Sequence, residues 1–192
     1  MKKLLFFAAC TAIFASCTSK KPYTITGEVD PSMNGKTVYL YDFHNARMTD
    51  SVVVAEGRFS FSGTMAGDSL RRVALDRNYV DVIVEGGDYT VDLAARTATG
   101  SKLTEEKGRF DAQYDSIRGA FYERYRALMA DASLSEEARE EKAEALVEEI
   151  NEALGEAARP VVEANNNALG AYVFWRWSSD LETPEEFDAA LA

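Results

Sequence analysis

Hydrophobic and polar residues alternate through most of the stretch from residue 23 to residue 93. Short runs rich in β-branched and aromatic residues are separated there by turn residues, including an Asn-Gly and a Gly-Gly pair. Because side chains on a strand point alternately to opposite faces, this pattern predicts half-buried β-strands. About seven such strands with turn signals between them predict an antiparallel β-sandwich or an open barrel, which we place at residues 23–98.

The turns in this stretch predict how some of the strands pair. The strands on either side of Ala55–Gly57, and those on either side of Glu85–Asp88, are separated by short turns that contain glycine. This spacing predicts two antiparallel hairpins. The strand at residues 37–43 has aromatic residues on one face and valine and leucine on the other. We therefore expect it to be covered on both sides or to lie in a sandwich.

Beyond Gly100 the hydrophobic period changes from two to three and four residues, which predicts amphipathic helices. The apolar stripe of the first helix consists of Leu103, Phe110, Tyr114, Ile117, Phe121, Tyr125 and Leu128. Thr104 is expected at its N-terminal end, and the capping box Ser133–Glu136 is expected to start a second helix. The narrow stripe of that helix favours an antiparallel helical hairpin, and Pro160 is expected to end or kink it. With the helical region at residues 99–192, the chain is predicted to be α+β.

An unusually apolar segment lies near the end of the chain. After a predicted break at Asn165–Asn167, the segment Leu169–Trp177 is apolar nearly all round, so we expect it to be buried or to await a partner. Its aromatic residues are expected to pack, and stacking on a sugar is an alternative for the two tryptophans. We take Tyr172, Trp175 and Trp177 as a candidate binding surface.

The last residues predict one more short helix. Thr183–Glu186 combines a threonine cap, a proline at the first helical position and a glutamate that closes the capping box. The sequence ends at Ala192, about two turns later, and a helix so short is marginal alone. We expect either that the chain is truncated before a further domain or that this helix packs on the preceding ones.

The N-terminus predicts delivery to the cell envelope. Two lysines precede an apolar run, Leu4–Phe14, which is shorter than the ~20 residues that a membrane-spanning helix needs and is typical of a secretory signal. The run leads into Phe-Ala-Ser-Cys, which ends at Cys17 and resembles a bacterial lipobox, where the cysteine thiol is acylated. We expect a signal peptide at residues 1–16 and a lipidated tether at residues 17–22, on the periplasmic face of the outer membrane. Ordinary secretion with cleavage nearby is the alternative.

Charge and composition restrict the chemistry of the chain. It carries 32 Asp and Glu against 21 Lys and Arg, a net charge of −11, and nucleic acid is therefore not an expected partner. Of two cysteines, Cys10 lies in the predicted signal and Cys17 is the predicted lipid site, and His44 is the one histidine. Neither cysteine catalysis nor a multi-histidine metal site is predicted, and no cofactor is expected. Acid–base chemistry by carboxylates alone is the alternative that would make the chain an enzyme.

The motifs ITGEV, NGKTVYLYD and DSVVVAEGRFSFSG follow one another between residues 25 and 63. This set resembles the N-terminal β-domain of unknown function in Bacteroidota lipoproteins, which often precedes a thioredoxin-like domain of the thiol-disulfide oxidoreductase type. The resemblance implies a fold and no catalytic residues. It implies a non-catalytic, membrane-anchored accessory or interaction module of such an oxidoreductase. A stand-alone periplasmic lipoprotein that binds a ligand or a protein is the alternative.

Overall fold

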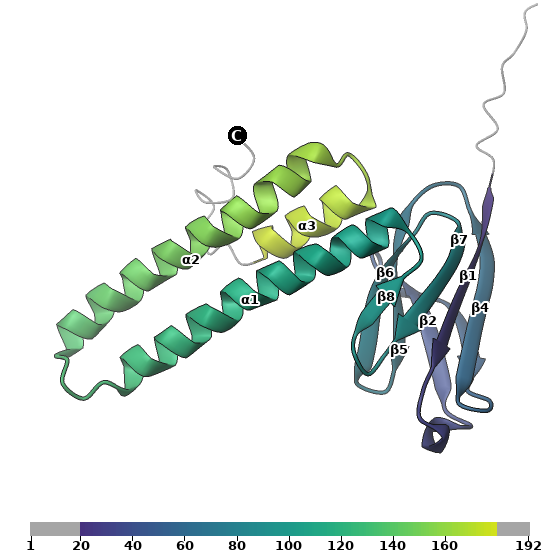
Figure 1. The fold of residues 1–192 in the computed structure, drawn as a ribbon, viewed down its shortest axis with the longest axis horizontal. Helices are drawn as coiled ribbons and strands as arrows, with labels where there is room; N and C mark the ends of the chain where they lie inside the picture. Colours follow the sequence, from purple (N-terminus) through teal and green to yellow (C-terminus); the bar gives the residue numbers. More distant parts are fainter. Residues whose placement is uncertain (1–19, 180–192) are drawn as a thin grey trace, which may run out of the picture.

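The computed structural model of the protein describes residues 20–179, where eight β-strands precede three α-helices (Figure 1). The strands are β1 (Lys21–Glu28), β2 (Thr37–Asp42), β3 (Arg47–Val53), β4 (Arg58–Met65), β5 (Ser69–Leu75), β6 (Asn78–Val84), β7 (Gly87–Asp92) and β8 (Thr97–Thr99). A short 3-10 helix, η1 (Pro31–Met33), lies between the first two. The predicted α+β class is confirmed. β8 is not among the predicted strands, because three residues are too few to show a period.

The strands form two four-stranded sheets, in the orders β4-β1-β7-β8 and β3-β2-β5-β6, and the sheets are not closed into a barrel. Apolar side chains from both sheets meet in one hydrophobic core. Ile25 and Tyr89 of the first sheet and Val38, Val73 and Val82 of the second are almost fully buried in it. The alternation in the sequence therefore marks the inner face of each sheet.

Three pairing predictions are wrong. β1 pairs with β7 in parallel, although all strands were expected to be antiparallel. β3 and β4 lie in different sheets, and so do β6 and β7, so neither predicted hairpin forms. The glycine turns move the chain from one sheet to the other, with Gly57, Gly86 and Gly87 at positive φ. β4 instead forms an eight-residue antiparallel register with β1.

Three helices follow the sheets: α1 (Lys102–Ala130), α2 (Glu136–Ala164) and α3 (Ala168–Ser178). Figure 1 shows α1 and α2 side by side as a long hairpin that extends away from the sheets, with α3 against the half nearer to them. A second hydrophobic core joins the three helices. Its buried residues are Phe110, Tyr114, Leu154, Ala158, Leu169, Tyr172, Val173 and Trp177, together with Ile83 of β6.

The helix ends differ in part from the prediction. Thr104 lies in the first turn of α1, at the expected end, but the cap is Ser101, whose side chain accepts a hydrogen bond from the backbone N–H of Thr104. Ser135 caps α2, two residues after the start of the predicted capping box. α2 does not end at Pro160 but continues to Ala164. The predicted break at Asn165–Asn167 is confirmed, and the Asn167 side chain caps α3.

Candidate functional site

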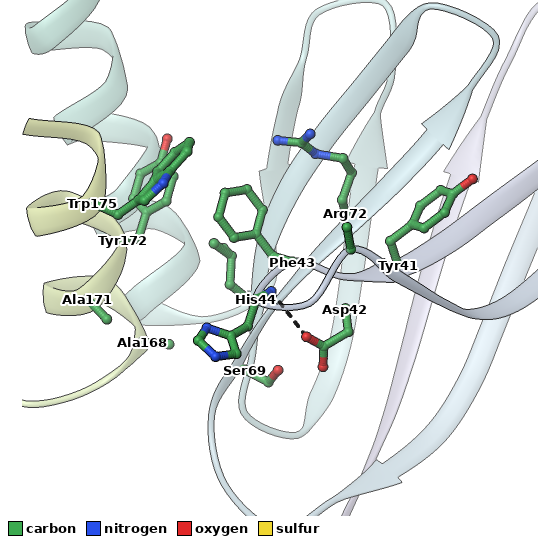
Figure 2. Close-up of a pocket in the computed structure, with 12 residues that line it drawn as sticks. Tyr41, Asp42, Phe43, His44, Ser69, Arg72, Ala168, Ala171, Tyr172 and Trp175 are labelled. Carbon is green, nitrogen blue, oxygen red and sulfur yellow. Dashed lines mark hydrogen bonds between the residues drawn. The ribbon is translucent and has the colours of Figure 1, made fainter. Parts of the chain in front are cut away.

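An open groove with a volume of about 730 Å³ lies where the helices meet the second sheet. Its walls are the turn between β2 and β3, the start of β5 and one face of α3 (Figure 2). This volume is in the range of ~300–1,000 Å³ that is usual for ligand sites. We name it the junction groove; its lining includes Tyr41, Asp42, Phe43, His44, Ser69, Arg72, Tyr172 and Trp175.

Two hydrogen bonds fix the walls of the groove relative to each other. The Phe43 N–H donates to the Leu70 carbonyl at 3.2 Å, which holds the end of β2 beside the start of β5. The Asp68 carboxylate, in the turn before β5, accepts from the backbone N–H of Ala168. A carboxylate at a helix N-terminus is stabilised by the free N–H groups and the helix dipole. This contact therefore orients α3 on the sheet.

Three aromatic rings form one side of the groove. The Phe43 and Trp175 centroids are 4.9 Å apart in an edge-to-face contact, and Phe43 lies 6.4 Å from Tyr172. Tyr172 and Trp175 are three residues apart on α3, so they occupy neighbouring positions on one face of that helix. Trp175 is 49% exposed although its neighbour Tyr172 is buried. A large aromatic surface is thus held in place and accessible.

Arg72 extends the aromatic wall. Its guanidinium lies 5.0 Å from the Phe43 centroid and 4.1 Å from that of Tyr79, within cation–π range of both. Nε and Nη2 donate to the two carboxylate oxygens of Asp81 at 2.7 and 2.8 Å. The hydrogen bonds to Asp81 raise the pKa of Arg72 above its ordinary value. Such a two-point contact fixes the plane of the guanidinium.

A buried polar network lies behind Tyr172. The Tyr172 hydroxyl donates to Asp111 at 2.6 Å, and Lys107 donates to the other oxygen of Asp111 at 2.7 Å. The Lys107 ammonium also lies 4.5 Å from the Tyr172 ring centroid. Burial, with the negative charge of Asp111 as a second cause, raises the pKa of Tyr172 far above its ordinary value. The hydroxyl therefore stays protonated as a donor, and the ring is fixed from behind.

The polar residues at the opposite side of the groove come from the end of β2 and the start of β5. Asp42 accepts from Nη1 of Arg71 at 3.1 Å and from the His44 N–H at 3.1 Å. Figure 2 shows the His44 ring and the Ser69 hydroxyl near the N-terminal end of α3. Asp42 and Arg72 therefore each contact an oppositely charged partner. The polar side of the groove also contains the His44 imidazole and the Ser69 hydroxyl.

The structure brings together two of the three predicted surface residues. Tyr172 and Trp175 line the groove, whereas Trp177 is 4% exposed and packs against Gly155 in the helical core. The Trp177 indole N–H has no hydrogen-bond partner among residues 20–179. The predicted lipid site, Cys17, lies outside the described residues, as do the signal peptide and the segment Thr183–Glu186.

Sequence reasoning missed Phe43, His44 and Arg72 as lining residues. The available signal was the aromatic face of the strand at residues 37–43, which was expected to be covered. Only part of that face is covered. Phe43 contacts α3, whereas Tyr39 on the same face is 37% exposed. Nothing in the sequence indicated that Arg72 would line the groove, because its role depends on contacts with Phe43 and Tyr79, which belong to other elements.

Within the described residues no three His, Cys, Asp or Glu side chains are grouped as a metal site. No helix in residues 20–179 has the length and apolar character needed to cross a membrane. The groove instead offers a fixed aromatic wall, a partly exposed tryptophan and a polar rim. Side chains of these kinds bind a ligand that has an apolar face and hydrogen-bonding edges.

Fold and groove together define a two-sheet β-domain with a helical arm and an open site at their junction. Residues 23–106 match the family described as "Domain of unknown function (DUF4369)". A DUF4369 domain is therefore present at residues 23–106, which is consistent with the predicted N-terminal domain of unknown function. The match covers the sheet residues of the groove and ends before α3. Comparison with curated proteins and with solved structures finds no significant match.

Proposed function

We propose that this protein is a non-catalytic binding module of the bacterial cell envelope, anchored through Cys17, and that it binds a ligand or a protein partner in the junction groove. The observation that carries the binding role is the aromatic wall of Phe43, Tyr172 and Trp175 beside the fixed Arg72. Trp, Tyr and Arg are the side chains that contribute most often to binding energy at interfaces.

The groove is suited to binding because its walls are already ordered. Tyr172 is held by Asp111, and Arg72 is held by Asp81. The two sheets would act as a sandwich that supports one wall, and the helical core supports the other. Groups that are ordered before a ligand arrives lose little conformational entropy on binding, which favours affinity.

Tryptophan fluorescence tests the binding role, because the two tryptophans differ in environment. In the Trp177→Phe variant only Trp175 emits, and we expect a bound ligand to shift or quench that emission. In the Trp175→Phe variant only the buried Trp177 emits, and the same ligand should leave it nearly unchanged. Equal responses of the two variants would place binding elsewhere, and circular dichroism of both checks that they are folded.

The anchor is tested separately. The lipobox-like sequence before Cys17 and the short polar tether after it support lipidation. Cells expressing the full chain are fed a fatty acid that carries an alkyne, and the membrane fraction is examined for the label. We expect label on the wild type and none on Cys17→Ser, which should also leave the membrane fraction. Label retained by Cys17→Ser would contradict the anchor.

The second candidate is an accessory role beside a thioredoxin-like thiol-disulfide oxidoreductase. It is favoured by the match at residues 23–106, which includes the strands whose motifs resemble the first domain of such lipoproteins. The partner domain would then contact the groove or the helical arm. A reading frame that continues past codon 192 into a Cys-x-x-Cys domain would support this role. A purified domain of that type that does not perturb Trp175 would count against contact at the groove.

A further inference from the structure

The aromatic wall of the groove continues across the outer face of the second sheet. The ring centroids of Trp175 and Phe43 are 4.9 Å apart. The Arg72 guanidinium carbon follows, 5.0 Å from the Phe43 centroid and 4.1 Å from the Tyr79 centroid. These four side chains, which we call the stacking row, come from α3, the end of β2, β5 and β6. Trp175 is 49% and Tyr79 is 42% exposed, so both ends of the row are accessible.

The strand register places another ring beside the row. Ala74 pairs with Tyr39 on one side and with Tyr79 on the other. Because directly paired residues share a face of the sheet, the small Ala74 side chain lies between two partly exposed tyrosines. The outer face is therefore a shallow aromatic track that leads away from the groove, and not a single closed pocket.

The charges that line the groove are compensated. Arg72 is paired with Asp81, and Asp42 is paired with Arg71. An anionic ligand would compete with Asp81 for Arg72, and a cationic ligand would meet the guanidinium already stacked on the rings. Within the groove neither charge is favoured, which suits a neutral ligand. At the far end of the row, the Arg96 guanidinium lies 5.8 Å from the Tyr79 ring centroid and has no ion pair among residues 20–179.

Polar atoms with free hydrogen-bonding capacity line the groove from which this track leads. Among residues 20–179, Nη1 of Arg72, the Ser69 hydroxyl and the His44 imidazole have no hydrogen-bond partner in the structure. None of them is a buried polar group without a partner, so all three are open to water. Such groups lose little by exchanging water for ligand hydroxyls, and they give direction to a contact that stacking alone leaves free to slide.

We propose that the junction groove and the stacking row bind a neutral, linear oligosaccharide; this rests on the binding role proposed above. A sugar ring has an apolar face of C–H groups, which stacks on an aromatic ring, and an equatorial rim of hydroxyls, which needs donors and acceptors at the side. Trp175 and Tyr79 supply two separated stacking positions, and Arg72, Ser69 and His44 supply the rim contacts. An extended peptide is the competing occupant.

The test titrates the whole mature chain with linear fragments of α- and β-linked glucose, mannose and xylose polymers, two to six sugars long. Calorimetry gives the affinity, and Trp175 emission in the Trp177→Phe variant reports the site. We expect at least one series to bind, with affinity that rises with chain length. Trp175→Ala should weaken all lengths tenfold or more, and Tyr79→Ala should weaken only the longer ones. Tyr122→Ala, an exposed tyrosine on α1 away from the row, is the matched control.

The outcomes separate this proposal from the general binding role. If no oligosaccharide binds while an unstructured peptide mixture changes Trp175 emission, the carbohydrate proposal is wrong and the binding role stands. If neither class affects Trp175, both fail. Oligosaccharide binding that Trp175→Ala and Tyr79→Ala leave unchanged would overturn the stacking row as its site.

Discussion

Tyr172 connects the groove to the helical core. Its ring faces Phe43 and Trp175, while its hydroxyl donates to Asp111 within the network that includes the buried Lys107. Removing one partner of a buried hydrogen bond to a charged group usually costs about 1.5–3 kcal/mol. One residue therefore contributes both to the shape of the site and to the stability of the helices.

The raised pKa of Tyr172 predicts a loss of stability at alkaline pH. In the unfolded chain a tyrosine ionises near pH 10, but burial raises the pKa of folded Tyr172 well beyond this. Stability from the buried, protonated hydroxyl is thus complete below about pH 10 and falls by up to ~1.4 kcal/mol per pH unit above it. Urea unfolding between pH 9 and about 11.5 should show a shallower decline in Tyr172→Phe.

Tyr122→Phe, on the exposed surface of α1, is the control for this measurement. It should retain the wild-type decline. If the free energy of unfolding of Tyr172→Phe falls with pH as steeply as that of the wild type, the result would contradict a buried, protonated Tyr172.

Residue spacing also explains which candidate was misplaced. Trp175 and Trp177 are two residues apart on one helix, and side chains at that spacing do not share a face. The structure follows this rule, since Trp175 lines the groove and Trp177 lies in the core. The helical period alone could have shown that the two tryptophans lie on different faces. It could not have shown which of them faces the sheet.

At the scale of the element, α3 depends on a tight entry from α2. Asn165 ends α2 and Asn167 caps α3, so the reversal takes three residues. Gly170, in the first turn of α3, lies so close that an added β-carbon would be 1.9 Å from the Asn165 carbonyl oxygen. Gly170 does not have a positive φ, so glycine is needed here for the close approach of the two backbone segments and not for its conformational freedom.

Gly170→Ala should therefore destabilise the protein by about 2–3 kcal/mol, since the turn must open to admit the methyl group. Gly119→Ala is the matched control inside α1, where no described atom comes within 4 Å of the added β-carbon. That change should stabilise by about 0.5–1 kcal/mol through helix propensity. Chemical denaturation measures both, and equal effects would mean that the α2–α3 turn is not tightly packed.

At the scale of the molecule, β6 joins the two cores. Val82 points into the core between the sheets, and its neighbour Ile83 points into the helical core; both are fully buried. The Thr104 hydroxyl donates to the Ile83 carbonyl at 2.7 Å and adds a polar contact at the same place. The orientation of the helical arm, and so the shape of the groove, depends on this strand.

Truncating each of these neighbours should affect different parts of the molecule. Ile83→Ala should cost about 2–5 kcal/mol and reduce amide protection mainly in α1 and α3. Val82→Ala should reduce protection mainly in the strands of both sheets. Hydrogen exchange followed by NMR distinguishes the two patterns. The same pattern for both variants would show that the sheets and the helices open only as one unit.

Local features were predictable from the sequence and long-range pairing was not. Val38 and Leu40 were predicted on one face of their strand and are buried, because alternation records which side faces apolar surroundings. The hairpins predicted at Ala55–Gly57 and Glu85–Asp88 were wrong. A short turn only requires the chain to reverse, and both the same sheet and the opposite sheet satisfy that requirement.

The sequence by itself determined the α+β class, the strands with a clear period of two, the long helical hairpin and the apolar character of Leu169–Trp177. Each of these depends on residues close together along the chain. Only the tertiary structure decided that β1 and β7 run parallel and that Phe43 and Arg72 meet Trp175 beside Tyr79. Those contacts join segments far apart in sequence. A local pattern marks which side chains are buried, but it does not encode which pairing of the strands brings them together in the two cores.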